Sequence, residues 1–159
     1  DRFTSGRGSQ TPDPGSDRQR PADRPLVIVA DTHLVSYLLI EGERTDAVRR
    51  VHEKDPDWRL ATLWRSAFLN VLTTAVNAAV LDRQQAFSTW WIAVDLFSGR
   101  EIEPDGDRVL SLALERQISA YDAHFVAVAD ELGVSLVTGD RAVTRPCADL
   151  AVAIVTFAE

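Results

Sequence analysis

Three aspartates stand at positions from which a carboxylate can do chemistry. Asp31 directly follows the apolar run 26–30, and Asp140 comes shortly after the apolar run 134–137. Asp122 opens a helical pattern that leads into the second of these runs. Because ligands of open α/β sheets bind beyond the carboxyl ends of the strands, we expect the three carboxylates to meet at one edge of a sheet.

Three carboxylates that meet without a cation repel one another, and their pKa values rise. A hard divalent cation such as Mg²⁺ is bound by oxygen ligands and removes this conflict. Each aspartate also has an ordinary alternative role: Asp31 suits a helix N-cap, Asp122 the first turn of a helix, and Asp140 a turn. The constellation, rather than any one member, indicates a metal site.

Short apolar runs without alternation are typical of strands that are buried on both faces of a parallel sheet. Between these runs, apolar side chains recur at steps of three and four residues, which is the period of an amphipathic helix. We predict strands at 26–30, 58–62, 101–103, 134–137 and 152–157, and helices at 32–40, 45–53, 63–81, 82–97, 109–118 and from Ser119 or Asp122 to Leu132. This alternation predicts an α/β protein with a three-layer α/β/α fold and a central, mainly parallel sheet.

The 159 residues suffice for one domain, which is preceded by a segment of different composition. Residues 1–25 are rich in Gly, Pro, Ser and Arg, and we predict a disordered N-terminal tail there. Since the tail starts at Asp1 rather than at a methionine, truncation, processing or an expression-derived origin are all compatible with it. The folded domain is predicted to span residues 26–159.

The chain has a net charge of −7, and residues 26–159 carry twelve basic and twenty acidic side chains. A domain with this excess of acidic side chains repels a phosphate backbone at long range, which disfavours simple electrostatic binding of nucleic acids. No apolar run approaches the roughly 20 residues that a membrane helix needs, and no secretory signal is recognisable. The sequence therefore predicts a cytoplasmic protein without a membrane segment.

Four stretches of the sequence carry a further pattern. They are Val27-Ile28-Val29-Ala30-Asp31-Thr32, the run from Leu63 to Leu72, the run from Ser119 to Ala129, and Leu136-Val137-Thr138-Gly139-Asp140. Together they resemble the successive motifs of PIN-domain ribonucleases, and among these the VapC-like toxins of bacterial toxin–antitoxin pairs. The resemblance implies a PIN-like nuclease domain in which Asp31, Asp122 and Asp140 hold Mg²⁺, with Mn²⁺ as a substitute. It also implies that Asn70 and Thr138 support this acidic site.

The sequence departs from the family pattern at Ala67, where the pattern has a glutamate. Ala67 precedes Asn70 by three residues and therefore lies on the same face of the predicted helix. Either the natural protein is a degenerate member of the family, or the glutamate was replaced so that a toxic nuclease could be produced. Glu41 and Glu43, in the loop after the first helix, are weaker candidates to substitute for it. We expect this chain to be nearly inactive and the Ala67→Glu variant to be a Mg²⁺-dependent endoribonuclease.

The resemblance further implies three partners: an RNA substrate, a cognate antitoxin whose segment occupies the acidic groove, and a second copy of the chain in a homodimer. Arg65 and Arg141 are candidates for contacts with RNA phosphates, with ordinary surface charge as the alternative. Apolar helices, including Trp90 and Trp91, are candidates for the protein contact surface, with burial in the core as the alternative.

Two other functions compete with the nuclease. A phosphatase of the haloacid-dehalogenase kind also begins with an aspartate after a buried strand. It needs a second aspartate two residues later, where this chain has His33, and is therefore disfavoured. A catalytically inactive PIN-like module that binds protein or RNA is favoured by Ala67 and opposed by the three retained acids. His33, His52 and His124 lack the spacing of metal ligands, and we interpret them as surface or helix residues.

Overall fold

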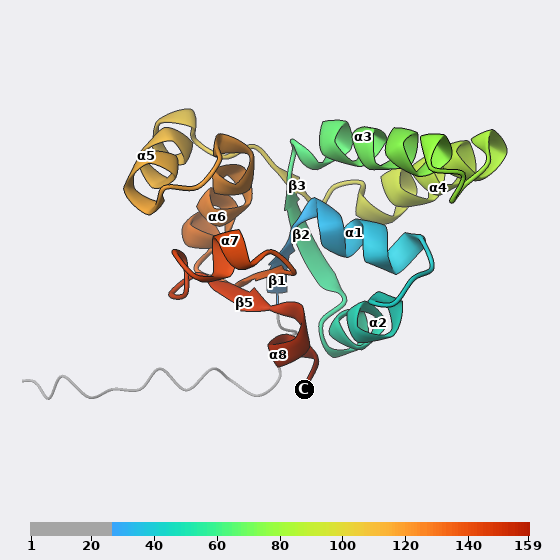
Figure 1. Ribbon diagram of the computed structural model, residues 1–159. Coiled ribbons are helices and arrows are strands. Elements are labelled where there is room, and N and C mark those ends of the chain that lie inside the picture. Colours follow the sequence, from blue (N-terminus) through green and yellow to red (C-terminus); the bar gives the residue numbers. More distant parts are fainter. Residues whose placement is uncertain (1–26) are drawn as a thin grey trace, which may run out of the picture.

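Five short parallel strands form one sheet at the centre of the molecule (Figure 1). The computed structural model describes residues 27–159, and the predicted tail at residues 1–25 lies outside this range. In chain order the strands are β1 (Val27–Ala30), β2 (Asp57–Ala61), β3 (Glu101–Ile102), β4 (Leu136–Thr138) and β5 (Ala151–Ala153). Their order across the sheet is β3-β2-β1-β4-β5, and every neighbouring pair is parallel.

Helices cover both faces of this sheet. They are α1 (Thr32–Leu39), α2 (Thr45–Lys54), α3 (Trp64–Asn77), α4 (Arg83–Phe97), α5 (Gly106–Arg116), α6 (Ala120–Leu132), α7 (Arg141–Thr144) and α8 (Ile154–Ala158). In Figure 1, α5, α6 and α7 lie to the left of the sheet and α1 to α4 lie to its right. The predicted three-layer α/β/α fold is confirmed.

The core explains why these segments fold as they do. The side chains of β1 are small, apolar and almost entirely buried, as expected of a central strand. On one side of the sheet, Trp58, Trp64 and Phe97 pack ring against ring, with centroids 5.6–6.1 Å apart. Each such buried side chain contributes about 1.5–3 kcal/mol of hydrophobic stabilisation. On the other side, α6 buries a nearly continuous apolar surface against β1, β2 and α5.

The strand order creates a ligand crevice next to β1. From β1 the chain first builds outward through β2 and β3, and it later returns to add β4 and β5 on the opposite side. The connections after β1 and β4 therefore diverge, and the carboxyl ends of these two strands border a crevice. Asp31 follows β1, and Asp140 follows β4, so the topology places both predicted ligands at this point.

Two predicted elements differ from the structure, and one helix was not predicted. Residues 152–157 form only the end of β5, followed by α8, because β4 offers a three-residue ladder and a short apolar run does not distinguish strand from helix. Helix α3 ends at Asn77 rather than at residue 81, where a left-handed residue, Ala79 (φ 57°), reverses the chain. The short helix α7 was not predicted. Within residues 27–159, no helix is both long and apolar enough to cross a membrane.

Candidate metal-binding cleft

Asp31 is held in place by two hydrogen-bond donors. Its Oδ1 accepts the backbone N–H of Leu34 at 3.0 Å, so the side chain caps helix α1. Its Oδ2 accepts the hydroxyl of Thr138 at the end of β4. The side chain is only 11% exposed. Because a carboxylate has about four acceptor sites, the capping role leaves room for a further ligand.

Thr138 connects the ends of the two strands that border the crevice. Its hydroxyl donates to Asp31 and accepts the backbone N–H of Asp140 at 3.1 Å. Asp140 in turn caps α7, because its Oδ1 accepts the N–H of Ala142 at 2.8 Å. One buried hydroxyl thus fixes the Asp31 carboxylate directly and the Asp140 backbone next to it.

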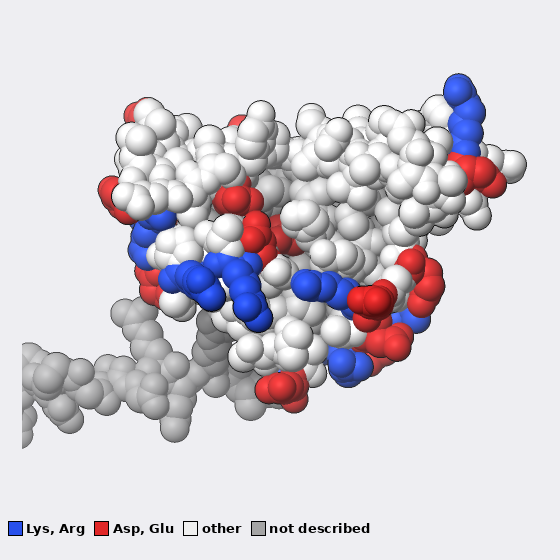
Figure 2. Space-filling view, in the orientation of Figure 1, with Lys and Arg blue, Asp and Glu red and all other residues white. Residues whose placement is uncertain are grey.

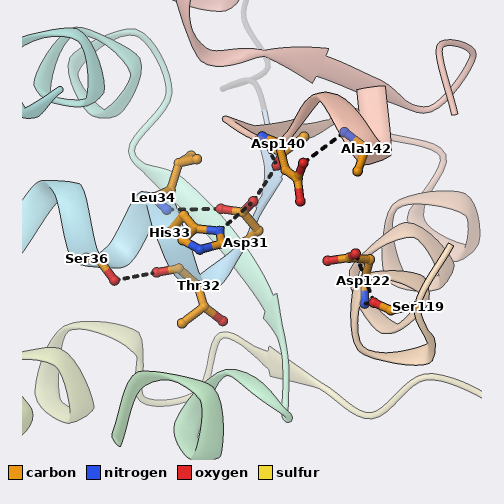
Figure 3. A network of polar contacts seen from close by, with 10 residues as sticks. Asp31, Thr32, His33, Leu34, Ser36, Ser119, Asp122, Asp140 and Ala142 are labelled. Atoms are coloured by element: carbon orange, nitrogen blue, oxygen red, sulfur yellow. Dashed lines mark hydrogen bonds and ion pairs between the residues drawn. The ribbon is translucent and has the colours of Figure 1, made fainter. Parts of the chain in front are cut away.

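Asp122 faces this pair from the first turn of α6 (Figure 3). Ser119 caps that helix: its hydroxyl accepts the Asp122 N–H at 3.1 Å and donates to Asp122 Oδ2 at 2.9 Å. Burial raises the pKa of Asp122, the hydrogen bond from Ser119 partly offsets this, and the charges of Asp140 and Asp31 raise it further. The three carboxylates are therefore close enough to repel one another.

A cleft of about 450 Å³ lies beside these acids. Its walls come from the start of α1, from α3 and from α6; the lining residues are Asp31, Thr32, His33, Leu63, Ser66, Ala67, Asn70, Val71, Tyr121, Asp122 and Phe125. Ala67 and Asn70 thus line the same cleft as Asp31 and Asp122, whereas Asp140 lies outside its lining. Over residues 27–159, no three His, Cys, Asp or Glu side chains are close enough to hold one ion directly.

His33 is an exposed residue of α1, as the sequence indicated, and it also lines this cleft. Its Nδ1 is 3.8 Å from Asp31 Oδ2, and its ring stacks on Tyr37 with centroids 6.2 Å apart. The nearby Asp31 carboxylate raises the pKa of His33, burial lowers it, and the charges of Asp140 and Asp122 raise it further. The available signal was its position two residues after Asp31, in the first turn of the same helix.

Arg44 is a second residue that the sequence did not reveal. Its guanidinium lies over the ring of Tyr37, 5.4 Å from the centroid. A Cβ at Gly139 would lie 2.6 Å from Arg44 Nη1, so only glycine permits this approach to the loop before Asp140. Among the described residues Arg44 has no carboxylate within ion-pair distance. No local pattern predicts it, because the contact depends on how the loop before α2 folds back.

The residues predicted to contact RNA, and those predicted to substitute for the missing glutamate, are not among the residues that line the cleft. Arg65 is paired with Glu101, with Nε 2.5 Å from Oε1, and lies outside the cleft lining. Arg141 is exposed directly after Asp140. Glu41 binds Arg49 at 2.9 Å, and both it and Glu43 line a different groove. Figure 2 shows the acidic hollow near the centre of this face, with basic side chains along its lower border.

The comparisons with known proteins decide the family. Residues 28–148 match the model of the PIN domain. The chain belongs to the PIN-domain family. Among solved structures, the chain resembles PAE2754 from Pyrobaculum aerophilum, with a TM-score of 0.66 and 20% identity over 84% of this chain and 87% of that one. It also resembles FitAcB from Neisseria gonorrhoeae, with a TM-score of 0.59 and 19% identity over 78% of this chain and 94% of that one. No curated protein matches the sequence significantly.

The donor set of this PIN domain fits a hard divalent cation. Its acids offer only oxygen atoms, and a cation would offset both the burial of Asp122, which raises its pKa most, and the charges of Asp140 and Asp31, which raise it further. Mg²⁺ commonly keeps several waters and takes one or two protein carboxylates, so it does not require three side chains in direct contact. Asp31 and Asp122, which both line the cleft, are the two acids best suited to it.

Proposed function

We propose that this PIN domain is built as a Mg²⁺-dependent endoribonuclease of the VapC-like toxin type, and that the present chain is impaired by Ala67. PIN domains are in general nucleases, which supports the reaction class. The observation that supports the proposal is that Asp31 and Asp122 line one cleft, with Asp140 held next to Asp31 through the hydroxyl of Thr138. They are close enough for the charges of Asp31 and Asp140 to raise the pKa of Asp122.

Each side chain of the cleft has a distinct task in this proposal. Asp31 and Asp122 would hold Mg²⁺ or Mn²⁺ directly, with Asp140 adding its negative charge beside them, and the hydroxyls of Thr138 and Ser119 orient the first two. When bound, the cation makes a water more acidic and offsets negative charge on the scissile phosphate. The chain itself positions the carboxylates and, through its basic rim, a neighbouring RNA phosphate. A metal at the acids reverses the local sign, which explains how so acidic a protein can approach RNA.

Ala67 is the reason to expect weak activity in this chain. It lines the cleft opposite the start of α1, one helical turn before Asn70, and its methyl group offers no oxygen. Loss of a ligand or of its hydrogen-bonded support commonly lowers metal affinity or activity by about ten- to a hundredfold. Asn70 is retained and would contribute a polar side chain to the same wall.

RNA cleavage in Mg²⁺ tests the proposal. We expect the Ala67→Glu variant to cleave single-stranded RNA about ten- to a hundredfold faster than the present chain, and chelation to abolish the cleavage. Asp122→Asn in the Ala67→Glu background is the matched control, since it removes one charge and keeps the shape; it should return activity to background. Equal activity with and without the glutamate would remove Ala67 from the explanation.

The alternative is a catalytically inactive PIN-like module that binds protein or RNA. Ala67 is the specific observation that favours it. Calorimetric titration with Mg²⁺ separates the two functions. A nuclease site binds the ion and loses it in Asp31→Asn, whereas an inactive module shows no binding that depends on Asp31.

The proposed biological setting follows the VapC-like resemblance. The nuclease would act in the cytoplasm as a homodimer, and a segment of a cognate antitoxin would occupy the acidic cleft. A basic side chain from such a segment would suit the uncompensated acids around Asp122. Apolar side chains on α3 and α4 are exposed and would provide protein contacts, among them Leu69, Phe87, Trp91 and Ile92.

A further inference from the structure

Thr32 carries a buried hydroxyl for which the structure provides no partner. It is the first residue of α1, it is 7% exposed, and its Oγ1 makes no hydrogen bond within residues 27–159. Thr45 offers a comparison within the same chain, since it is also the buried first residue of a helix. Its hydroxyl, however, accepts the N–H of Gly42 at 2.9 Å and donates to the carbonyl of Ile40. Because a buried polar group without a partner is destabilising, the orphan hydroxyl of Thr32 needs an explanation.

The hydroxyl is buried beside the acidic cleft. Thr32 lines the cleft together with Ala67 and Asn70, and α1 packs against α3, which carries both of these residues. In Figure 3 its side chain points away from the carboxylate of Asp31 and toward the green helix α3. Ala67 lines the same cleft from α3, and its methyl group cannot accept a hydrogen bond.

The two acids that line the cleft each accept a hydrogen bond from a hydroxyl group. Asp31 receives the hydroxyl of Thr138, and Asp122 receives the hydroxyl of Ser119. Thr32, which lines the cleft together with Ala67, carries a hydroxyl that has no carboxylate among the described residues to receive it.

We infer that Thr32 is a positioning residue for an acid at position 67: its hydroxyl donates a hydrogen bond to the carboxylate that the intact nuclease site would carry on α3. The inference rests on the proposed function in that it takes position 67 to be acidic in the active nuclease. It assigns to Thr32 the same task that Thr138 performs for Asp31. The hydroxyl of Thr32 then lacks a partner in the present chain because the carboxylate that would accept its hydrogen bond is absent at position 67.

A double-mutant cycle in metal-free buffer tests this without RNA. Urea unfolding is measured for the chain, Thr32→Val, Ala67→Glu and the double variant. In the present chain, Thr32→Val should leave the unfolding equilibrium constant unchanged or lower it, since the lost hydroxyl has no partner. In the Ala67→Glu background the same change should raise that constant, giving a coupling of at least about threefold.

Thr45→Val provides the matched control. It should destabilise both backgrounds equally, because its hydroxyl is already bonded within its own loop. Thr32→Ser in the Ala67→Glu background keeps the hydroxyl and should restore both the stability and the Mg²⁺ affinity that Thr32→Val lowers about tenfold. If Thr32 acted only through the packing of its methyl group, serine would not restore the Mg²⁺ affinity.

A coupling below threefold overturns the inference. So does a Thr32→Val variant of the present chain that is as destabilised as Thr45→Val, because the hydroxyl would then already be satisfied. Strong coupling combined with no gain of RNA cleavage in the Ala67→Glu variant would leave the inference standing and overturn the proposed nuclease. The two failures are therefore distinguishable.

Discussion

Single residues of this cleft perform structural and chemical tasks at once. Asp31 caps helix α1, which is the ordinary role that its position predicts, and Asp140, whose predicted ordinary role was a turn, caps the short helix α7. The same caps fix the direction of each carboxylate, so the structural role does not compete with the chemical one. From the sequence, the positions after β1 and β4 predicted which acids come together. The contacts of His33 and Arg44 with the site could not be predicted, since they depend on side-chain directions and on a loop that folds back.

Arg44 should contribute to RNA binding. Its guanidinium is held over Tyr37 next to Gly139 and has no carboxylate partner in the described chain, so its charge is available to a phosphate. We expect Arg44→Ala to weaken binding of a single-stranded RNA oligonucleotide about three- to tenfold and to reduce the salt dependence by about one counterion. Fluorescence anisotropy over a range of salt concentrations measures both quantities.

The control for Arg44 is Arg108→Ala, because Arg108 is paired with Asp130 at 2.8 Å, on the α5–α6 side of the molecule. Gly139→Ala gives an independent check: the new Cβ must displace the flexible Arg44 side chain. It should weaken RNA binding in the present chain and have little further effect in Arg44→Ala. Equal losses in the Arg44 and Arg108 variants would contradict a specific role.

Asp55 should make the protein less stable at neutral pH than at mildly acidic pH. Burial raises the pKa of this fully buried carboxyl to about 6, although its Oδ1 accepts the N–H of Asp57. Between about pH 4 and 6 the native state therefore holds more protons than the unfolded state, and the free energy of unfolding falls as pH rises. Asp55→Asn should remove this dependence and stabilise the protein by about 1–3 kcal/mol at pH 7.5, as measured by urea unfolding.

The comparison for Asp55 is between two pH values. The stabilising effect of Asp55→Asn at pH 4.5 should be about a third of its value at pH 7.5, because at pH 4.5 the native carboxyl is protonated while most unfolded-state carboxyls are already ionised. Asp46→Asn, a change to an exposed acid on α2, should show no such difference. A stabilisation by Asp55→Asn that is the same at both pH values would show that the buried charge is not the cause.

At the scale of elements, the start of α3 is tied to the sheet by Glu101 of β3. Its carboxylate accepts the indole N–H of buried Trp64 and the guanidinium of Arg65, both at 2.5 Å. These hydrogen bonds lower the pKa of Glu101, chiefly through Arg65, against the opposing effect of burial. Since α3 carries Ala67 one turn later, this contact sets the position of one wall of the cleft.

Glu101→Ala should therefore destabilise the protein by about 1–3 kcal/mol, because it leaves the buried indole N–H of Trp64 without an acceptor. Glu101→Gln retains an acceptor oxygen and should have a smaller effect. Urea unfolding at pH 7 compares the two variants. Equal stability of the alanine variant and the parent would mean that the indole finds another partner.

The elements that the sequence predicted best are those with long, strong patterns. Helix α4 matches its prediction to within a residue, since Asp82 and Gln85 form a capping box and Ser98-Gly99 ends the apolar period. The last segment failed for a physical reason: its tertiary partners decide its conformation. Lys54 of α2 bonds the carbonyl of Phe157 and lies over its ring, so α8 is held by contacts distant in sequence. Local periodicity does not contain this information.

At the scale of the whole molecule, charge and apolar surface are separated. In Figure 2 the acids of the cleft lie in a hollow, whereas the surface over α3 and α4 is almost free of charged groups except at its far tip. Trp91 is 64% exposed and Ile92 56% exposed on α4, next to an apolar groove between α3 and α4. Contiguous exposed apolar surface of this kind marks a protein contact site.

The α3–α4 surface should hold two copies of the chain together. At tens of micromolar, sedimentation velocity should give a dimer, because association buries Trp91 and Ile92 and removes their apolar area from water. Introducing Trp91→Glu together with Ile92→Glu should produce a folded monomer, since exposed side chains contribute little to monomer stability. Leu114→Glu, at a 71% exposed position on α5, is the matched control and should remain dimeric. A parent chain that is strictly monomeric would contradict the dimer, and dissociation by Leu114→Glu alone would assign the contact to α5 instead.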